Sequence, residues 1–231
     1  MKRFYREAAA VAGPDGWHVA LDGRQVKTQG GHVLVLPNEA LARLLAAEWE
    51  RQGEELDPRG FAMRDLADYA LDVVAEDKAA AVAALLRYAE TDTLCYRADP
   101  DEALWRRQQA LWEPLLAACE ARHGIALRRV SGVMHRPQDA AALAALRERL
   151  ERMDFLTLAA LTTLTALAAS LVIGLAALEG DAAGEALWQA ANLEEEWQAE
   201  RWGRDPDAAA RDEKRKADFL AAMQFAAAVR G

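Results

Sequence analysis

The chain has 231 residues, which is long enough for one large domain or two small ones with a substantial buried core. Its 37 acidic residues outnumber 28 lysines and arginines, so the net charge is -9. A nucleic-acid partner is therefore not expected, because phosphate binding needs clustered cations. Cys95 and Cys119 match no metal-binding or redox spacing, which is typical of a reducing compartment. The first residues lack the apolar segment of a secretory signal, so we expect a cytoplasmic location in a bacterium.

Residues 4–36 predict a small antiparallel sheet. Asp22 and Gly23 stand between two alternating apolar segments, and this pair is a strong hairpin signal because both central residues of a type I′ turn need positive φ. Pro37 and Asn38 then open a helix that runs to about Gln52. The expected strands are 4–11, 17–21, 24–28 and 32–36.

The rest of the chain has a helical pattern after the break at 58–60. We therefore predict an α+β fold, with a β-rich N-terminal domain and one helix at 1–60 and a larger, all-helical domain at 61–231. A short strand within 124–132 is a candidate to rejoin the N-terminal sheet. The expected helices are 61–75, 77–90, 101–122, 137–152, 155–178, 182–202 and 206–229.

The segment 155–178 carries no charged residue, and we expect the helical domain to be organised around it as one helix. A helix that is apolar on nearly all sides must be enclosed by other helices or by lipid. Its many alanines and threonines, and flanks without an excess of positive charge, favour a protein core. We therefore expect no stable membrane insertion.

Motifs for catalysis are scarce. The sequence has no phosphate-binding glycine loop, no zinc-binding HExxH and no GxSxG nucleophile motif, and its four histidines lie in separate segments. The alternative that remains is a metal-assisted hydrolase that uses Asp92 and the Glu194–Glu196 cluster. Turn and capping roles are the more ordinary explanation of such acidic residues.

The most informative segment is the expected helix 182–202. Trp188, Glu195 and Trp202 are spaced seven residues apart, which predicts that they share one face. An acid between two tryptophans is either paired with a cation inside the protein, such as Arg97 or Arg201, or offered to a partner. The sequence leaves these two interpretations open.

Several segments, in this order and spacing, resemble the assembly chaperones for the α subunit of the F-type ATP synthase catalytic head. The two most specific are ETDTLCYR at 90–97 and LEEEWQAERWGRD at 193–205. Weaker matches occur at 21–24 with 27–28, at 37 with 41–42, at 48–49 with 52, at 109, 112 and 114, and at 170–171.

The resemblance implies a binding protein that is not an enzyme and needs no cofactor. We expect the chain to be a monomer, although the sequence itself carries no signal of oligomeric state. Such a protein binds the unassembled α subunit and covers the surface that the β subunit later occupies. Trp188 belongs to the candidate partner-binding set through its spacing from Glu195. The residues that the resemblance itself assigns to partner binding are Glu195, Trp202, Gly203, Asp205, Asp92, Tyr96 and Arg97.

Overall fold

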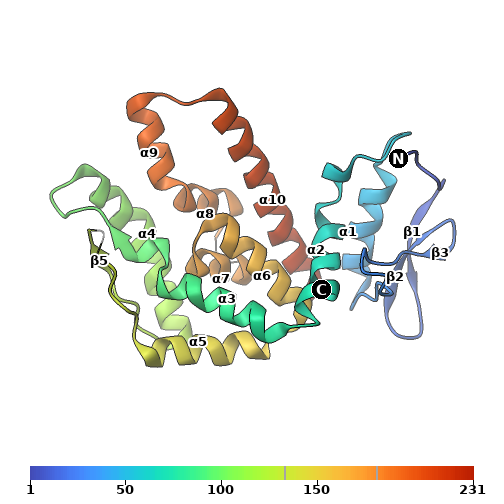
Figure 1. Cartoon of the computed structure of the whole chain (residues 1–231), viewed down its shortest axis with the longest axis horizontal. Coiled ribbons are helices and arrows are strands. Elements are labelled where there is room, and N and C mark those ends of the chain that lie inside the picture. The colour runs from blue at the N-terminus through green and yellow to red at the C-terminus, as the bar shows by residue number, and fades with distance from the viewer. Residues whose placement is uncertain (133, 181) are drawn as a thin grey trace. The chain divides into compact units, whose positions relative to one another are not determined.

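The computed structural model describes residues 1–132, 134–180 and 182–231 (Figure 1). The predicted α+β class is confirmed, because a three-stranded antiparallel sheet is followed by a mostly helical chain. Two compact units are present. The first consists of Met1–Lys78, Asp154–Ala160 and Ala221–Gly231, and the second of Ala79–Met153 and Leu161–Leu220. The boundary thus differs from the expected one at residue 60, because the helices just after Gly60 pack with the N-terminal part.

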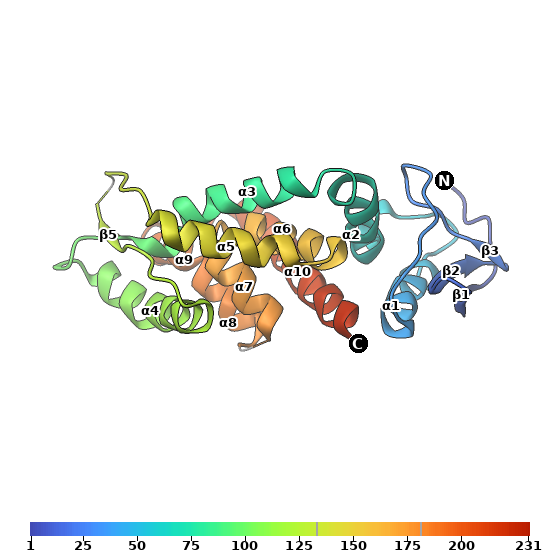
Figure 2. The same ribbon diagram turned by 90° about the horizontal axis from the view of Figure 1, so that it is seen from below.

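The sheet of the first unit has the order β1 (Ala8–Ala12), β2 (Trp17–Leu21), β3 (Arg24–Gln25). Asp22 and Gly23 have φ values of 48° and 79°, which is the positive φ that the hairpin prediction requires. The expected strand at 32–36 is reduced to isolated bridges, which join Trp17 to Leu36 and Lys27 to Val33. Helix α1 (Glu39–Glu50) packs against β1 and β2 (Figure 2).

Asn38 joins two distant parts of the first unit. Its side-chain oxygen accepts a hydrogen bond from the backbone N–H of Leu41 at 2.9 Å and so caps α1. Its side-chain nitrogen donates to the backbone oxygens of Ala228 at 2.8 Å and Val229 at 3.1 Å. These oxygens lie in the last turn of α10 (Pro206–Arg230), where a helix has no internal donors for its carbonyls.

Short helices complete the first unit, and the second unit is a helical assembly in which α4 packs against α7 and α9 (Figure 2). The remaining elements are η1 (Pro58–Gly60), α2 (Ala62–Tyr69), η2 (Ala70–Val74), α3 (Lys78–Glu90), η3 (Thr93–Cys95), β4 (Tyr96–Arg97), α4 (Ala103–His123), β5 (Val130–Ser131), α5 (Ala140–Arg152), α6 (Phe155–Ala168), α7 (Leu171–Glu179), α8 (Gly184–Ala191) and α9 (Leu193–Trp202).

The strand expected within 124–132 exists but does not rejoin the N-terminal sheet. It is β5, and it pairs in parallel with β4, so that Tyr96 lies opposite Val130 and Arg97 opposite Ser131. The backbone N–H of Gly132 extends this pairing by donating to the oxygen of Arg97 at 3.0 Å. The partner strand β4 thus comes from the ETDTLCYR segment. It has only two residues, which is too short for a strand pattern to be recognised in the sequence.

The prediction of one continuous helix at 155–178 is wrong. The chain forms α6 and α7, separated by Ala169 and Ser170. Ala169 has a φ of 49°, a left-handed conformation that ends a helix. The Ser170 hydroxyl then accepts a hydrogen bond from the N–H of Ile173 at 3.1 Å and begins α7. In the described part of the chain, no helix has both the length and the apolar character needed to cross a membrane.

Asp92 explains why so apolar a segment breaks at this point. Its carboxylate is fully buried and accepts hydrogen bonds from the Ser170 hydroxyl at 2.8 Å and from the N–H of Val172 at 3.0 Å. It also accepts one from the N–H of Leu94 at 3.0 Å. The free N–H groups at the start of α7 therefore receive an internal acceptor whose negative charge suits a helix N-terminus.

We expect Asp92→Asn to destabilise the second unit by about 2–4 kcal/mol, because an amide has one acceptor oxygen and turns its own N–H groups toward other donors. Urea unfolding followed by far-UV circular dichroism measures the loss. The exposed Asp101→Asn is the matched control and should leave the free energy of unfolding within about 0.5 kcal/mol of the original. An equally small change in the Asp92 variant would contradict the buried-acceptor role.

Asp92 should also make stability depend on pH. Burial raises the pKa of Asp92 from 3.8 to about 6 in the folded protein, against the lowering effect of its hydrogen bonds. Because the unfolded chain loses this proton first, the contribution to stability falls as the pH rises from about 4 to about 6 and is constant above that. The stability advantage of the original chain over Asp92→Asn should be about 2 kcal/mol larger at pH 4.5 than at pH 7. An advantage that grows with pH would show that the folded pKa is lowered.

Candidate functional site

A groove of about 380 Å³ lies on the second unit between α9 and the first turns of α10. Four of the eight predicted site residues line it: Glu195, Trp202, Gly203 and Asp205. Gly203 ends α9 with a φ of 87°, a value that favours glycine. Asp205 begins α10, because its carboxylate accepts hydrogen bonds from the N–H groups of Asp207 at 3.3 Å and Ala208 at 3.2 Å.

The three consecutive glutamates of α9 have different surroundings, because successive side chains on a helix point about 100° apart. Glu194 accepts a hydrogen bond at 2.7 Å from the buried amide of Gln108 on α4. Glu196 forms an ion pair with Arg204 across the end of α9. Glu195 points outward, with its side chain 67% exposed and Arg215 at 3.8 Å. A long, exposed pair of this kind contributes roughly 0–1 kcal/mol, so most of the Glu195 carboxylate stays available to a partner.

The prediction that Trp188, Glu195 and Trp202 share one face is wrong. The expected helix 182–202 is interrupted at Asn192, whose side-chain nitrogen donates to the oxygen of Trp188 at 2.9 Å. The ring of Trp188 is 4% exposed and packs on Phe219, with 5.5 Å between the ring centres. Trp202 is 77% exposed at the groove. Trp188 therefore belongs to the core and Trp202 to the surface.

Trp197 and Arg107 were not singled out from the sequence, and Arg201 was considered only as a partner of Glu195. The guanidinium groups of Arg107 and Arg201 lie over the Trp197 ring, at 4.5 Å and 4.4 Å from its centre. Arg107 comes from α4 and also pairs with Glu200 at 2.8 Å. The spacing of Trp197 and Arg201, one helical turn apart, predicts their contact, whereas nothing in the sequence identifies Arg107.

Two of the predicted residues in the ETDTLCYR segment, Asp92 and Arg97, are buried. Arg97 is 4% exposed and donates hydrogen bonds to the oxygen of Leu94 at 2.8 Å and to Glu113 at 3.1 Å. Its guanidinium lies 5.5 Å from the ring centre of Trp112. The indole N–H of Trp112 in turn donates to the oxygen of Ala190 at 2.7 Å. The ETDTLCYR segment is thus connected through α4 to the end of α8, just before the second segment of specific resemblance.

Arg97 does not pair with Glu195, so the first of the two internal cations considered for that glutamate is excluded. Arg129 donates a hydrogen bond to Glu113, and with Arg97 it holds the pKa of Glu113 below its ordinary range. Tyr96 points elsewhere, and its hydroxyl is hydrogen-bonded to His135 at 3.0 Å.

The geometry gives little support to the metal-assisted hydrolase. Both oxygens of Asp92 are occupied by hydrogen bonds inside the protein. Among the residues that the structure describes, no group of three or more His, Cys, Asp or Glu side chains is arranged to hold a metal ion. The hydrolase hypothesis therefore loses Asp92 as a ligand.

Comparison with known proteins gives the family. The sequence profile of the ATP12 chaperone protein family matches residues 2–120. The crystal structure of Atp12 from Paracoccus denitrificans superimposes with a TM-score of 0.93 and 37% identity, covering 99% of this chain and 98% of that one. The chain belongs to the ATP12 chaperone family.

Other proteins that are similar to this chain match it along most of its length. Mitochondrial Atp12 of the fission yeast Schizosaccharomyces pombe is 26% identical over 219 residues, which cover 90% of this chain and 75% of the yeast protein. A candidate chaperone from Agrobacterium tumefaciens has a TM-score of 0.93 and 37% identity over 98% of this chain and 85% of its own. A variant of the Paracoccus protein with an aspartate replaced by lysine matches as closely as the original.

For this ATP12 chaperone, the structure divides the predicted site residues into two groups. Glu195 and Trp202 line the groove with exposed side chains, whereas Asp92, Arg97 and Trp188 are enclosed. An enclosed side chain supports a surface but does not touch a partner protein. The groove is therefore the candidate interaction site.

Two tryptophan variants should separate core from surface. Trp188→Ala is expected to cost about 3–5 kcal/mol, because it leaves a large cavity beside Phe219. Trp202→Ala should change the free energy of unfolding by no more than about 0.5 kcal/mol, because its ring is mostly in solvent. Urea unfolding measures both free energies. A loss of stability in Trp202→Ala as large as in Trp188→Ala would show that the Trp202 ring is buried in solution.

Proposed function

We propose that this chain binds the unassembled α subunit of the F-type ATP synthase catalytic head and prevents its aggregation until it pairs with β. The proposal rests on membership of the ATP12 chaperone family and on the exposed Trp202 at the groove. In this role the chain acts by binding alone, without a catalytic step or a cofactor.

Trp202 is the observation that carries the proposal. A tryptophan that is 77% exposed leaves a large apolar area in water, and such side chains are frequent at the centres of protein interfaces. Burying roughly 200 Å² of this ring against a partner contributes about 5 kcal/mol before the costs of association. An unassembled subunit with a free apolar interface offers the complementary surface.

Glu195 supplies selectivity beside this apolar contact. Its carboxylate is exposed, and its nearest cation, Arg215, is held from behind by a hydrogen bond to the oxygen of Leu167 at 2.9 Å. Arg215 also lies over the Trp188 ring, at 5.4 Å from its centre. The cation is thus fixed within the second unit, while the carboxylate is free to pair with a basic group of the client.

Co-purification tests the proposal. A tagged chain expressed with the α and β subunits should retain α and not β. Glu195→Lys should reduce the retained α at least tenfold, because it places a cation opposite the basic group of the client, and Trp202→Ala should weaken retention to a similar extent. Circular dichroism of both variants should match the original chain.

The matched control is Glu76→Lys, which makes the same change of charge at an exposed position of the first unit. It should retain α as well as the original chain does. Retention of β in place of α would overturn the choice of client. Full retention of α by Glu195→Lys and Trp202→Ala would move the binding site away from the groove.

A further inference from the structure

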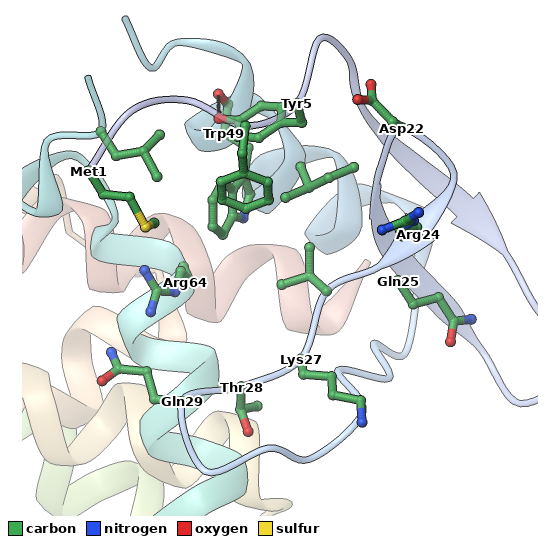
Figure 3. Close-up of a pocket in the computed structure, with 14 residues that line it drawn as sticks. Met1, Tyr5, Asp22, Arg24, Gln25, Lys27, Thr28, Gln29, Trp49 and Arg64 are labelled. Atoms are coloured by element: carbon green, nitrogen blue, oxygen red, sulfur yellow. Dashed lines mark hydrogen bonds between the residues drawn. The ribbon is translucent and has the colours of Figure 1, made fainter. Parts of the chain in front are cut away.

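The first unit contains a second concave surface, a cavity of about 740 Å³ (Figure 3). Its walls come from the N-terminal segment, from the β2–β3 hairpin with the loop that follows it, and from helices α1 and α2. The cavity shares no residue with the groove on the second unit. Its volume lies in the range of natural ligand-binding pockets, which is about 300–1,000 Å³.

Part of the cavity wall is apolar and accessible. Phe4 is 63% exposed and contacts Tyr5 edge to face, with 5.4 Å between the ring centres. Trp49 of α1 also lines the cavity, with 7% of its surface exposed. Phe61, which precedes α2, packs on the Trp49 ring with 4.5 Å between the ring centres. The indole N–H of Trp49 is buried and has no acceptor among the described residues. An unpaired buried donor costs about 1–3 kcal/mol.

The charged residues of the wall are mainly positive. Arg24, Lys27 and Arg64 are spaced around the cavity (Figure 3). Arg64 is paired with Asp68 at 3.3 Å, whereas Arg24 and Lys27 are exposed and form no ion pair in the described part of the chain. The net charge of the whole protein is -9, so two unpaired cations in one wall, Arg24 and Lys27, are a local exception. Their charge is complementary to an anionic ligand.

The wall contains one acidic residue, Asp22. The Asp22 carboxylate accepts hydrogen bonds from the backbone N–H groups of Arg6 and Glu7, both at 3.0 Å. These bonds hold the N-terminal segment against the β2–β3 hairpin. The same bonds lower the pKa of Asp22, so its carboxylate stays ionised as well as exposed. Because Arg24, Lys27 and Arg64 outnumber this one carboxylate, the charged residues of the wall keep a positive balance.

The cavity also borders an open strand. Arg24 and Gln25 form β3, which is the edge strand of the three-stranded sheet, and both line the cavity. An edge strand presents backbone N–H and C=O groups to which an extended peptide can add. A small anion would use the cations but not this edge, so the combination favours a peptide.

We propose that this cavity binds an extended peptide segment in which a carboxylate stands next to a large apolar side chain. The apolar side chain packs on Phe4 and Trp49, and the carboxylate pairs with Arg24 or Lys27. The peptide backbone runs along β3. This second interaction surface is independent of which subunit binds to the groove on the second unit.

Peptide binding to the full chain tests this proposal by fluorescence anisotropy. The probe is a fluorescein-labelled hexapeptide in which Asp or Glu alternates with Leu or Phe, and the comparison peptide has Asn and Gln in place of the acids. We expect the acidic peptide to bind at least tenfold more tightly. We also expect its affinity to fall when salt is raised from 50 to 300 mM, because salt screens exposed charges.

The variant Arg24→Glu/Lys27→Glu should weaken binding of the acidic peptide at least tenfold. The control Arg106→Glu/Arg136→Glu makes the same change of net charge at exposed positions of the second unit and should bind like the original chain.

Three results would overturn the proposal: no binding of the acidic peptide at 1 mM, equal binding of the two peptides, or equal binding by the Arg24/Lys27 variant and its control. The groove is tested separately in the same assay. Glu195→Lys should bind the acidic peptide like the original chain even where it fails to retain α. Failure of one proposal therefore leaves the other intact.

Discussion

Asp92 lies where the turn after α3 meets the start of α7, and the second unit is built around the hydrogen bonds that its carboxylate accepts. Burial of a charge is costly, and here donors from Leu94, Ser170 and Val172 offset part of that cost. The same contacts separate α6 from α7. The most apolar part of the chain thus becomes two short helices that surround a polar centre.

This buried support determines what the surface of the second unit presents. Arg97 and Trp112 connect the turn after Asp92 to the end of α8, through the bond from Trp112 to the oxygen of Ala190. Gln108, on the same helix as Trp112, holds Glu194 at the beginning of α9. Glu195 follows on the helix, about 100° around its axis, and its side chain is 67% exposed. Contacts made by enclosed residues thus help to set the orientation of the helix that presents Glu195.

Much of the fold follows from local patterns. The Asp22–Gly23 turn, the capping of α1 by Asn38 and most helices were predictable because each depends on residues that are close in sequence. The break at Ala169 was not, because its cause lies at Asp92, far away along the chain. A helical pattern cannot reveal that an acceptor from another segment supplies a new helix start.

The sequence located the segment of the candidate site but not the arrangement of its side chains. Resemblance located the segment that forms the groove, but the shared face assumed for Trp188 and Trp202 depended on a continuous helix, and Asn192 interrupts it. Asp92 and Arg97 stand in a specific motif, yet the motif alone does not distinguish a residue that touches a partner from one that supports the fold. Burial makes that distinction, and burial is a property of the assembled structure.

The hydrogen bonds from Asn38 to Ala228 and Val229 have a consequence for biosynthesis. The first unit contains both the N-terminal residues and the segment Ala221–Gly231, so it is completed only after the ribosome has made the whole second unit. At about 5–20 residues per second, this delay is on the order of ten seconds. During that time the N-terminal sheet and α1 lack the last turn of α10. The N-terminal part of the nascent chaperone thus stays incomplete, with its capping contacts unmade, until the last turn of α10 has been synthesised.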